Sequence, residues 1–397
     1  MTIELSKRIQ RVKPSPTLAV SAKAKQMKAA GKDVISFSAG EPDFSTPESI
    51  CNAAIKAIED RKTRYTPASG IPELRTAVVE KLKRENELEY QASDIVISVG
   101  AKHSLYNIIQ SLINDGDEVI IAQPYWVSYP AMIQLAGGVP KIIDTIASGY
   151  KVTPEQLVTA VTGQTKAFIF NNPSNPTGVV YSQQEIEALA KVCIENNIIV
   201  ISDEIYEHLI YDGLNHYSIA QCPEMQERTI VVNGVSKSYA MTGWRIGYMA
   251  GPTNIAAAVG KLQSQSTSNP TSIAQYGALE ALTGDQAFIK EWRDEFSRRR
   301  DILCERLSAL DSVKCIKPQG AFYMFVDMSA LLTRAYQGET IKTTLRLAEL
   351  LLEKILIAVV PGEAFGAPGF IRFSYAVSAD VINTGIDRLA GFIKELS

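Results

Sequence analysis

The chain has 397 residues, of which 46% are hydrophobic and 21% are charged, and its formal net charge is −3. This composition is typical of a globular protein with a large core and room for more than one domain. The small negative charge gives no electrostatic reason to expect nucleic acid or an anionic membrane as a partner.

The cysteines and the N-terminal residues bear on the cellular compartment. Five cysteines are scattered without a CxxC pair, and the three histidines form no close metal-binding pattern. We therefore expect free thiols in a reducing compartment and no bound metal. Residues 1–13 lack the apolar core of a signal peptide, and no run approaches the ~18 apolar residues of a membrane span. The expected location is the cytoplasm.

Between residues 94 and 232, short apolar runs alternate with segments of helical periodicity. The predicted strands are 94–98, 118–122, 166–170, 198–202 and 229–232, and the predicted helices are 102–112, 128–135 and 182–196. This alternation predicts a mostly parallel sheet with helices on both faces. In such an open sheet, a binding site lies beyond the carboxyl ends of the strands.

The C-terminal part of the chain has a different pattern. Residues 287–310 form a long charged helical pattern that contains Arg298, Arg299 and Arg300. We expect this triplet to lie on a solvated helix face, and the alternative is an anion-binding site. Further stretches predict a second, smaller α/β unit: 320–327, 340–353 (helical), 356–360 and 369–374.

A lysine and an arginine follow the last strand of the first unit. Lys237 lies among small and hydroxyl residues, and Arg245 follows eight residues later between glycines. A partly desolvated lysine can react as a neutral amine with a carbonyl, and an arginine can hold a phosphate with its planar fork. Pyridoxal phosphate (PLP) requires both features. Because most lysines are solvated surface charges, the pair alone decides little.

Five polar residues lie at or just beyond the ends of apolar runs, in the order Asn175, Asp203, Tyr206, Lys237 and Arg245. This order and spacing resemble the class I aminotransferases of PLP fold type I. The wider pattern is similar to the bacterial-type aspartate aminotransferase subgroup. The resemblance covers nearly the whole chain and is supported by the segments 38–44, 65–75, 124–130 and 372–376.

The resemblance implies an α/β fold with a mostly parallel seven-stranded sheet, flanked by helices, and a smaller α/β domain. The implied division is an N-terminal arm and part of the small domain (1–45), a large PLP-binding domain (46–290) and a small C-terminal domain (291–397). It also implies a homodimer with shared active sites, because Tyr65 resembles a tyrosine that reaches the phosphate of the neighbouring subunit. The alternative for Tyr65 is a core aromatic residue.

The resemblance assigns the contacts of the cofactor's ring and aldehyde carbon to four residues. Lys237 carries it as an internal aldimine and moves a proton at the substrate Cα. Asp203 keeps the pyridine nitrogen protonated, and Asn175 and Tyr206 donate hydrogen bonds to the phenolate oxygen. The alternatives are a strand-end cap for Asp203 and a turn for Asn175. Glu204 points to the other side of an extended chain, and we expect it to be structural.

The phosphate of the cofactor is expected at a helix N-terminus, where free amides and the helix dipole favour an anion. Residues 98–102 end a predicted strand and begin a helix, so Gly100, Ala101 and Lys102 can supply this site. The resemblance adds a bidentate contact from Arg245 and a hydroxyl from Ser236.

The remaining implied residues contact the ring and the substrate. Trp126 resembles the aromatic residue that stacks on the cofactor, and buried packing is its alternative. Arg372 resembles the arginine that binds the substrate α-carboxylate, assisted by Asn175 and the backbone at Gly40. A structural salt bridge is the alternative for Arg372, because an arginine among apolar residues is costly unless it is paired.

The preferred substrate depends on a second cation for a distal carboxylate. Some aminotransferases supply an arginine from the segment equivalent to 263–269, which contains none here. In the subgroup that this chain resembles, the corresponding residue is Lys102; a phosphate contact or a surface charge are its alternatives. The expected reaction is transfer of the amino group of L-aspartate to 2-oxoglutarate in ping-pong half-reactions. The alternatives are prephenate, aromatic or alanine-type substrates, or a non-catalytic PLP-binding regulator.

Overall fold

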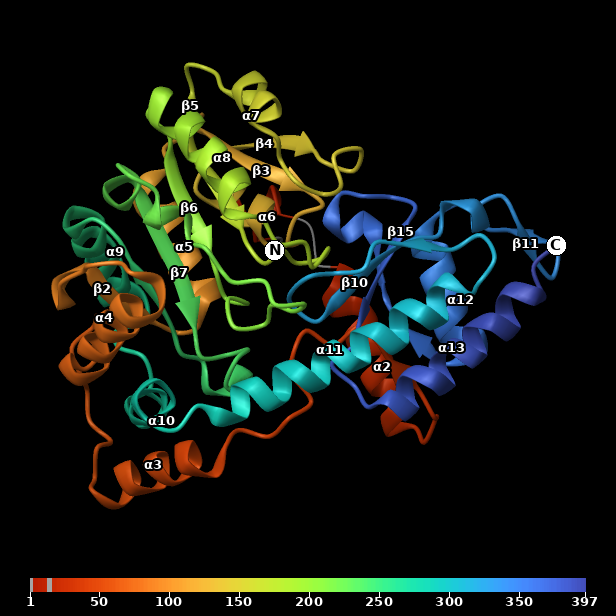
Figure 1. Cartoon of the computed structure of the whole chain (residues 1–397), viewed down its shortest axis with the longest axis horizontal. Coiled ribbons are helices and arrows are strands. Elements are labelled where there is room, and N and C mark those ends of the chain that lie inside the picture. Colours follow the sequence, from red (N-terminus) through yellow and green to blue (C-terminus); the bar gives the residue numbers. More distant parts are fainter. Residues whose placement is uncertain (1–2, 13–15) are drawn as a thin grey trace.

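The computed structural model describes residues 3–12 and 16–397 (Figure 1). Its larger sheet has seven strands in the order β2-β8-β7-β6-β5-β3-β4. All neighbours from β7 to β4 pair in parallel, and only β8 runs against its neighbours β2 and β7. The strands are β2 (Ile95–Ser98), β3 (Glu118–Gln123), β4 (Val139–Asp144), β5 (Thr165–Asn171), β6 (Ile199–Asp203), β7 (Thr229–Gly234) and β8 (Gly247–Ala250). The predicted α/β class with a mostly parallel seven-stranded sheet is confirmed.

Helices cover both faces of this sheet because successive strand residues point to opposite sides. Val119 and Ile121 of β3 pack against α5 and α6, whereas Ile120 packs against α8 on the other face. Ser182 starts α8 by accepting the backbone N–H of Glu185. The helices around the sheet are α3 (Glu48–Glu59), α4 (Pro72–Asn86), α5 (Ala101–Leu112), α6 (Tyr129–Leu135), α7 (Pro154–Ala160), α8 (Gln183–Glu195), α9 (Thr253–Ser266) and α10 (Ser272–Thr283).

The C-terminal part forms a four-stranded antiparallel sheet in the order β14-β15-β10-β9. Its strands are β9 (Lys314–Cys315), β10 (Tyr323–Asp327), β14 (Val360–Pro361) and β15 (Phe370–Ser374), and its helices are α11 (Ala287–Ser308), α12 (Thr344–Ile355) and α13 (Ala379–Lys394). In Figure 1, the long helix α11 runs from the side of the large sheet to this smaller unit. The predicted helix 340–353 begins at residue 344 because Thr343 caps it; the pair β11 (Ala335–Tyr336) and β12 (Glu339–Thr340) precedes it.

The N-terminal residues join the C-terminal unit. Strand β1 (Ile35–Ser36) pairs in parallel with β13 (Ile357–Ala358). Two helices precede it, α1 (Lys7–Gln10) and α2 (Pro16–Ala29). This pairing is compatible with the predicted division at residues 45 and 290, which stays a prediction; residues 1–2 and 13–15 of the predicted arm lie outside the described residues. No helix in the described part is long and apolar enough to cross a membrane.

The arginine triplet of α11 forms neither the fully solvated helix face nor the anion-binding site that the sequence analysis considered. Arg298 is exposed, but Arg299 and Arg300 are buried. Arg300 binds both carboxylate oxygens of Asp212 at 2.8 Å, and Arg299 pairs with Asp43 at 2.7 Å. The prediction of a solvated face is therefore wrong for two of the three residues. They tie α11 to loops that are distant in the sequence, because a buried guanidinium needs a paired carboxylate.

Candidate active site

A cavity of about 430 Å³, here called the main cavity, lies beyond the carboxyl ends of β5, β6 and β7. Residues of the small sheet, on β10 and β15, close its other side. All the site residues predicted from the sequence line it except Gly100 and Tyr65: Gly40, Ala101, Lys102, Trp126, Asn175, Asp203, Tyr206, Ser236, Lys237, Arg245 and Arg372. The strand-end rule accounts for Asn175, Asp203 and Lys237, which follow β5, β6 and β7, whereas Arg372 comes from the small sheet.

Lys237 lies in the loop that follows β7. Its Nζ donates a hydrogen bond to the backbone oxygen of Gly40. Burial and the nearby Arg372 lower the pKa of the Lys237 amine to about 8, against a smaller opposing effect of Glu41. A larger fraction of this amine is therefore neutral near pH 7 than for an exposed lysine, as a nucleophile or a base requires.

Asp203 ends β6 and is 5% exposed. Burial raises the pKa of its carboxyl to about 6, although the hydroxyl of Tyr129 and the N–H of Ile205 act in the opposite direction. Tyr129 donates to Oδ2 at 2.7 Å from the first turn of α6. The sequence analysis missed Tyr129; the available signal was its position three residues after Trp126, in the same segment 124–130.

The phenol of Tyr206 enters the main cavity one turn after Asp203. Its hydroxyl lies 2.9 Å from that of Tyr323 on β10, a second residue that the sequence analysis missed. Burial raises the pKa of Tyr206 well above 10. Tyr206 therefore stays protonated at neutral pH and can donate a hydrogen bond.

Arg372 extends from the middle of β15 and is 3% exposed. Its Nη1 donates to Oδ1 of Asn175 at 3.0 Å and its Nη2 to the backbone oxygen of Ser38 at 3.2 Å. Within residues 3–12 and 16–397, its Nε has no hydrogen-bond partner and no carboxylate forms an ion pair with it. The guanidinium therefore lacks an anionic partner from this chain, which disfavours the structural salt bridge and favours an anionic ligand.

The start of α5 and Arg245 form the opposite end of the main cavity. Gly100 caps α5 with φ 85°, and a Cβ at this position would lie 2.4 Å from Nη2 of Arg245. Only glycine therefore lets the guanidinium cross the helix N-terminus. Nη1 and Nη2 of Arg245 donate to the backbone oxygens of Thr242 and Val99. The helix start and this cation together suit a phosphate.

Lys102 and Trp126 lie beside each other. Nζ of Lys102 is 4.8 Å from the centre of the Trp126 ring. Lys102 is exposed by surface area, but partial desolvation at the edge of the main cavity and, to a smaller extent, the charge of Arg245 lower its pKa. Within residues 3–12 and 16–397 no carboxylate forms an ion pair with it, so its ammonium is accessible to an anion in the main cavity. A surface charge and a phosphate contact stay its alternatives.

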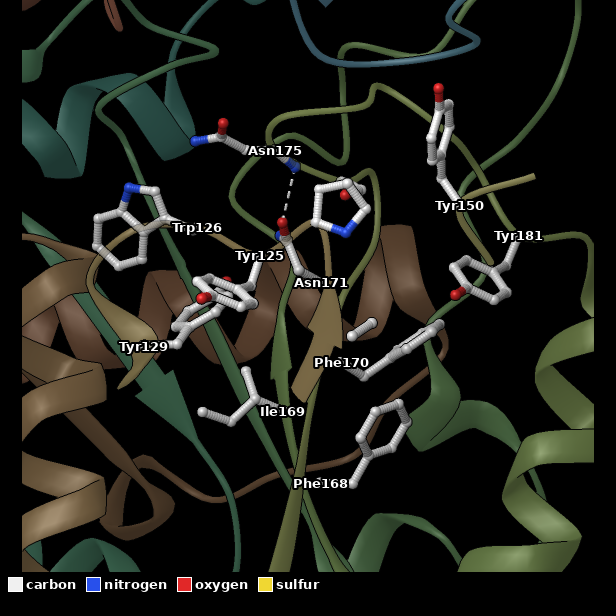
Figure 2. Close-up of a pocket in the computed structure, with 13 residues that line it drawn as sticks. Tyr125, Trp126, Tyr129, Tyr150, Phe168, Ile169, Phe170, Asn171, Asn175 and Tyr181 are labelled. Carbon is white, nitrogen blue, oxygen red and sulfur yellow. Dashed lines mark hydrogen bonds between the residues drawn. The ribbon is translucent and has the colours of Figure 1, made fainter. Parts of the chain in front are cut away.

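A smaller cavity lies behind Trp126 and Asn175 and is lined mostly by aromatic rings (Figure 2). The backbone N–H of Asn175 donates to Oδ1 of Asn171 at 2.8 Å, the dashed line in Figure 2. Asn171 in turn donates through Nδ2 to the backbone oxygen of Asp203 at 2.9 Å. Asn171 thus hydrogen-bonds to the backbones of both Asn175 and Asp203 and fixes their relative position.

Tyr65 is a predicted site residue whose side chain lies away from the main cavity. It is 92% exposed and does not line the main cavity of its own chain. The alternative of a core aromatic residue is therefore wrong, and the contact with a neighbouring subunit stays a prediction.

Comparison with known proteins agrees with this geometry. Residues 32–389 match the family model of aminotransferase class I and II. The chain belongs to this family. It is 50% identical to an aspartate aminotransferase from Bacillus sp. (strain YM-2), over 98% of this chain and 99% of the relative. It is 47% identical to an aspartate/prephenate aminotransferase from Cereibacter sphaeroides (strain ATCC 17029 / ATH 2.4.9), over 99% of each chain. The crystal structure of the aspartate aminotransferase from Rhizobium meliloti superposes with a TM-score of 0.96 at 42% identity, covering 100% of both chains.

Proposed function

We propose that this aminotransferase uses PLP to transfer the amino group of L-aspartate to 2-oxoglutarate, which gives oxaloacetate and L-glutamate in two half-reactions. The observation that carries the proposal is the arrangement of three groups around one cavity: the Lys237 amine, the Asp203 carboxylate and the Arg372 guanidinium. The relatives named aspartate aminotransferase support the choice of substrate.

The residues present fit PLP. The hydrogen-bond donors to the Asp203 carboxylate from the described residues, Tyr129 and the amide of Ile205, are uncharged, so a protonated ring nitrogen would supply the missing cation. The unpartnered Nε of Arg372 likewise suits a substrate carboxylate.

Each end of the cofactor has a proposed set of contacts. Asp203 would hold the ring nitrogen, and Asn175 and Tyr206 the ring oxygen. Trp126 would stack on the ring. The phosphate would be held by the amides of Gly100, Ala101 and Lys102, by Ser236 and by Arg245. When bound, PLP supplies an electron sink for the carbanion formed at the substrate Cα.

The protein residues then orient the substrate and move its proton. Arg372 binds the α-carboxylate with its planar fork, together with Asn175, which fixes the Cα–H bond relative to Lys237. The Lys237 amine would accept the Cα proton and donate it to the C4′ carbon of the cofactor, which lies across the substrate nitrogen from Cα, and its lowered pKa favours the neutral form that this step needs. Lys102 is proposed to bind the distal carboxylate of a dicarboxylic substrate.

Two further parts of the proposal concern assembly and substrate range. Tyr65 is 92% exposed, and Ile55 and Ile58 of α3 are about half exposed. These residues support a homodimer in which Tyr65 reaches the cofactor phosphate of the partner. The relatives named aspartate/prephenate aminotransferase favour prephenate as a second acceptor.

Spectroscopy of the PLP-loaded protein tests the proposal. Addition of L-aspartate should change the visible absorbance of the bound cofactor and release oxaloacetate, and 2-oxoglutarate should reverse the change. L-Phenylalanine, L-alanine and prephenate, assayed in the appropriate half-reaction, rank the alternatives. A cofactor spectrum that responds to no amino acid would exclude transamination and favour a non-catalytic regulator.

A further inference from the structure

The turn that carries Asp203 and Tyr206 has a second side that faces away from the main cavity. Glu204 and Glu207 leave the turn on this side and are 1% and 8% exposed. The turn itself is closed by backbone hydrogen bonds from Glu207 to Glu204 and from Leu209 to Tyr206. Side chains therefore alternate between the main cavity and a buried polar cluster.

Glu207 is bound by three side chains from two elements. The ammonium of Lys81, on α4, contacts Oε1 and is only 1% exposed. Asn233 of β7 donates to the same oxygen at 2.7 Å, and Asn86 donates to Oε2 at 3.1 Å. Lys81 also donates to Oδ1 of Asn86 at 2.7 Å. The carboxylate is thus fixed in both position and orientation.

Glu204 is held in the same way by other neighbours. The hydroxyls of Ser202 and Ser218 donate to Oε1 at 2.8 and 2.6 Å, and Nε2 of His216 lies 2.9 Å from Oε2. Every carboxylate oxygen of Glu204 and Glu207 therefore has a protein partner. Nδ1 of His216 has no hydrogen-bond partner among the described residues, but the two carboxylates are fully paired, and such buried hydrogen bonds restrict their geometry.

The carboxylates and histidines of this cluster are close enough to suggest a cation site, either at Glu85, Glu207 and His208 or at Glu204, Glu207 and His216. The Lys81 ammonium already takes the first position, because it contacts Glu207 and lies 3.5 Å from Glu85. Burial raises the pKa of Glu207, but the nearby Lys81, with smaller effects of His208 and His216, lowers it below its usual range overall. The Glu207 carboxylate is therefore paired with the Lys81 ammonium and not with a bound cation.

We propose that Glu207, through its hydrogen bonds to Asn233 and Asn86, is a positioning residue that holds Asp203 and Tyr206 at the proposed cofactor site, and that Lys81 balances its charge. The inference rests on the proposed function. A buried ion pair contributes little to stability compared with an apolar pair of the same size, but loss of one partner leaves an uncompensated charge. Its directed hydrogen bonds can still fix the turn that an apolar pair would leave free to shift. The predicted effect is therefore on the cofactor site and not only on folding.

The test compares two double variants, because both remove the charges together. In Lys81→Met/Glu207→Gln, the side-chain amide of Gln can still accept a hydrogen bond from Asn233 and donate one to Asn86, so the turn keeps both contacts. In Lys81→Met/Glu207→Ala, both hydrogen bonds are lost. Two measurements are made on each variant. The first is the melting temperature of the cofactor-free protein, and the second is a titration of PLP binding and of pH that gives the Kd of PLP and the pH midpoint of its absorbance change. Tyr206→Phe is the reference for loss of the Tyr206 hydrogen bond.

We expect the Gln variant to match the wild type at the cofactor site. The Ala variant should shift the pH midpoint upward, in the direction of Tyr206→Phe, and weaken PLP binding roughly 3- to 10-fold, as loss of one hydrogen bond predicts. Leu189→Ala, a fully buried position on α8, is the control: it should lower the melting temperature and leave the midpoint unchanged.

The outcomes separate the two proposals. If Tyr206→Phe moves the midpoint and the Ala variant does not, the cluster is only structural and the inference is overturned. If Tyr206→Phe itself leaves the midpoint unchanged, the role of Tyr206 in the proposed function is wrong and the inference falls with it. If the Ala variant does not fold, Asn233→Ala removes one donor to Glu207 without changing a charge and is judged by the same two readouts.

Discussion

Tyr129→Phe removes the hydroxyl that donates to Asp203 Oδ2 at 2.7 Å and leaves the ring in place. A hydrogen bond to a charged group is worth about 1.5–3 kcal/mol, and one pKa unit corresponds to about 1.36 kcal/mol. The Tyr129 hydroxyl lowers the pKa of Asp203, which burial raises to about 6. Without it, the pKa of Asp203 should rise by roughly 1–2 units, so that about half or more of the carboxyl is protonated at pH 7 in the cofactor-free protein.

Infrared titration of the buried carboxyl band, with isotope-labelled aspartate, measures this pKa without cofactor or substrate. The charged groups that face Asp203 are Lys237 and Glu204, and neither is changed by the substitution. Tyr125→Phe removes another hydroxyl from the lining of the smaller cavity, which Tyr129 also lines, and should leave the titration unchanged. An Asp203 titration identical in wild type and Tyr129→Phe would refute the reasoning.

Three other substitutions test the proposed roles directly. Lys237→Ala should abolish the absorbance change on adding L-aspartate and lower turnover by several orders of magnitude, since both the amine and the proton carrier are lost; near-normal turnover would contradict the central assignment. Asp203→Asn should weaken PLP binding and slow Cα deprotonation severely, whereas Asp203→Glu should be milder; wild-type rates in the Asn variant would reduce Asp203 to a structural cap. Lys102→Ala should lower kcat/KM for aspartate by roughly 10- to 100-fold and spare phenylalanine. An equal loss for both substrates would assign Lys102 to the cofactor phosphate, and no loss would mean that Lys102 is a surface charge that contacts neither substrate nor cofactor.

The positions of strands and helices were predictable because hydrophobic periodicity and strand ends depend on residues that are neighbours in the sequence. The strands β3, β5 and β6 and the helix α8 lie within two residues of their predicted bounds. The candidate site residues that follow these strands were found in the same way. Glu204 was also expected to be structural, and its buried hydrogen bonds agree with that expectation.

The missed residues depend on contacts between distant parts of the chain. Tyr129 lies 74 residues from Asp203, and Tyr323 lies 117 residues from Tyr206. Similarly, Arg300 is buried by Asp212, which lies 88 residues away, so its helical pattern alone indicated solvent exposure. Nothing in the spacing near these residues specifies which side chain will face them after folding.

The charge of the main cavity explains why its lining residues, which come from distant parts of the chain, together suit an anionic ligand. Its ionisable lining contains four basic side chains, Lys102, Lys237, Arg245 and Arg372, but only two acidic ones, Glu41 and Asp203. The cavity is therefore positive in a chain whose net charge is −3, and it attracts anions. In the proposed function, a phosphate at Arg245 and an α-carboxylate at Arg372 would use two of these cations, and Lys237 would serve as the reacting amine. Among the described lining residues, Lys102 would then be the cation left for a second substrate carboxylate, so that preference would depend on this one flexible side chain.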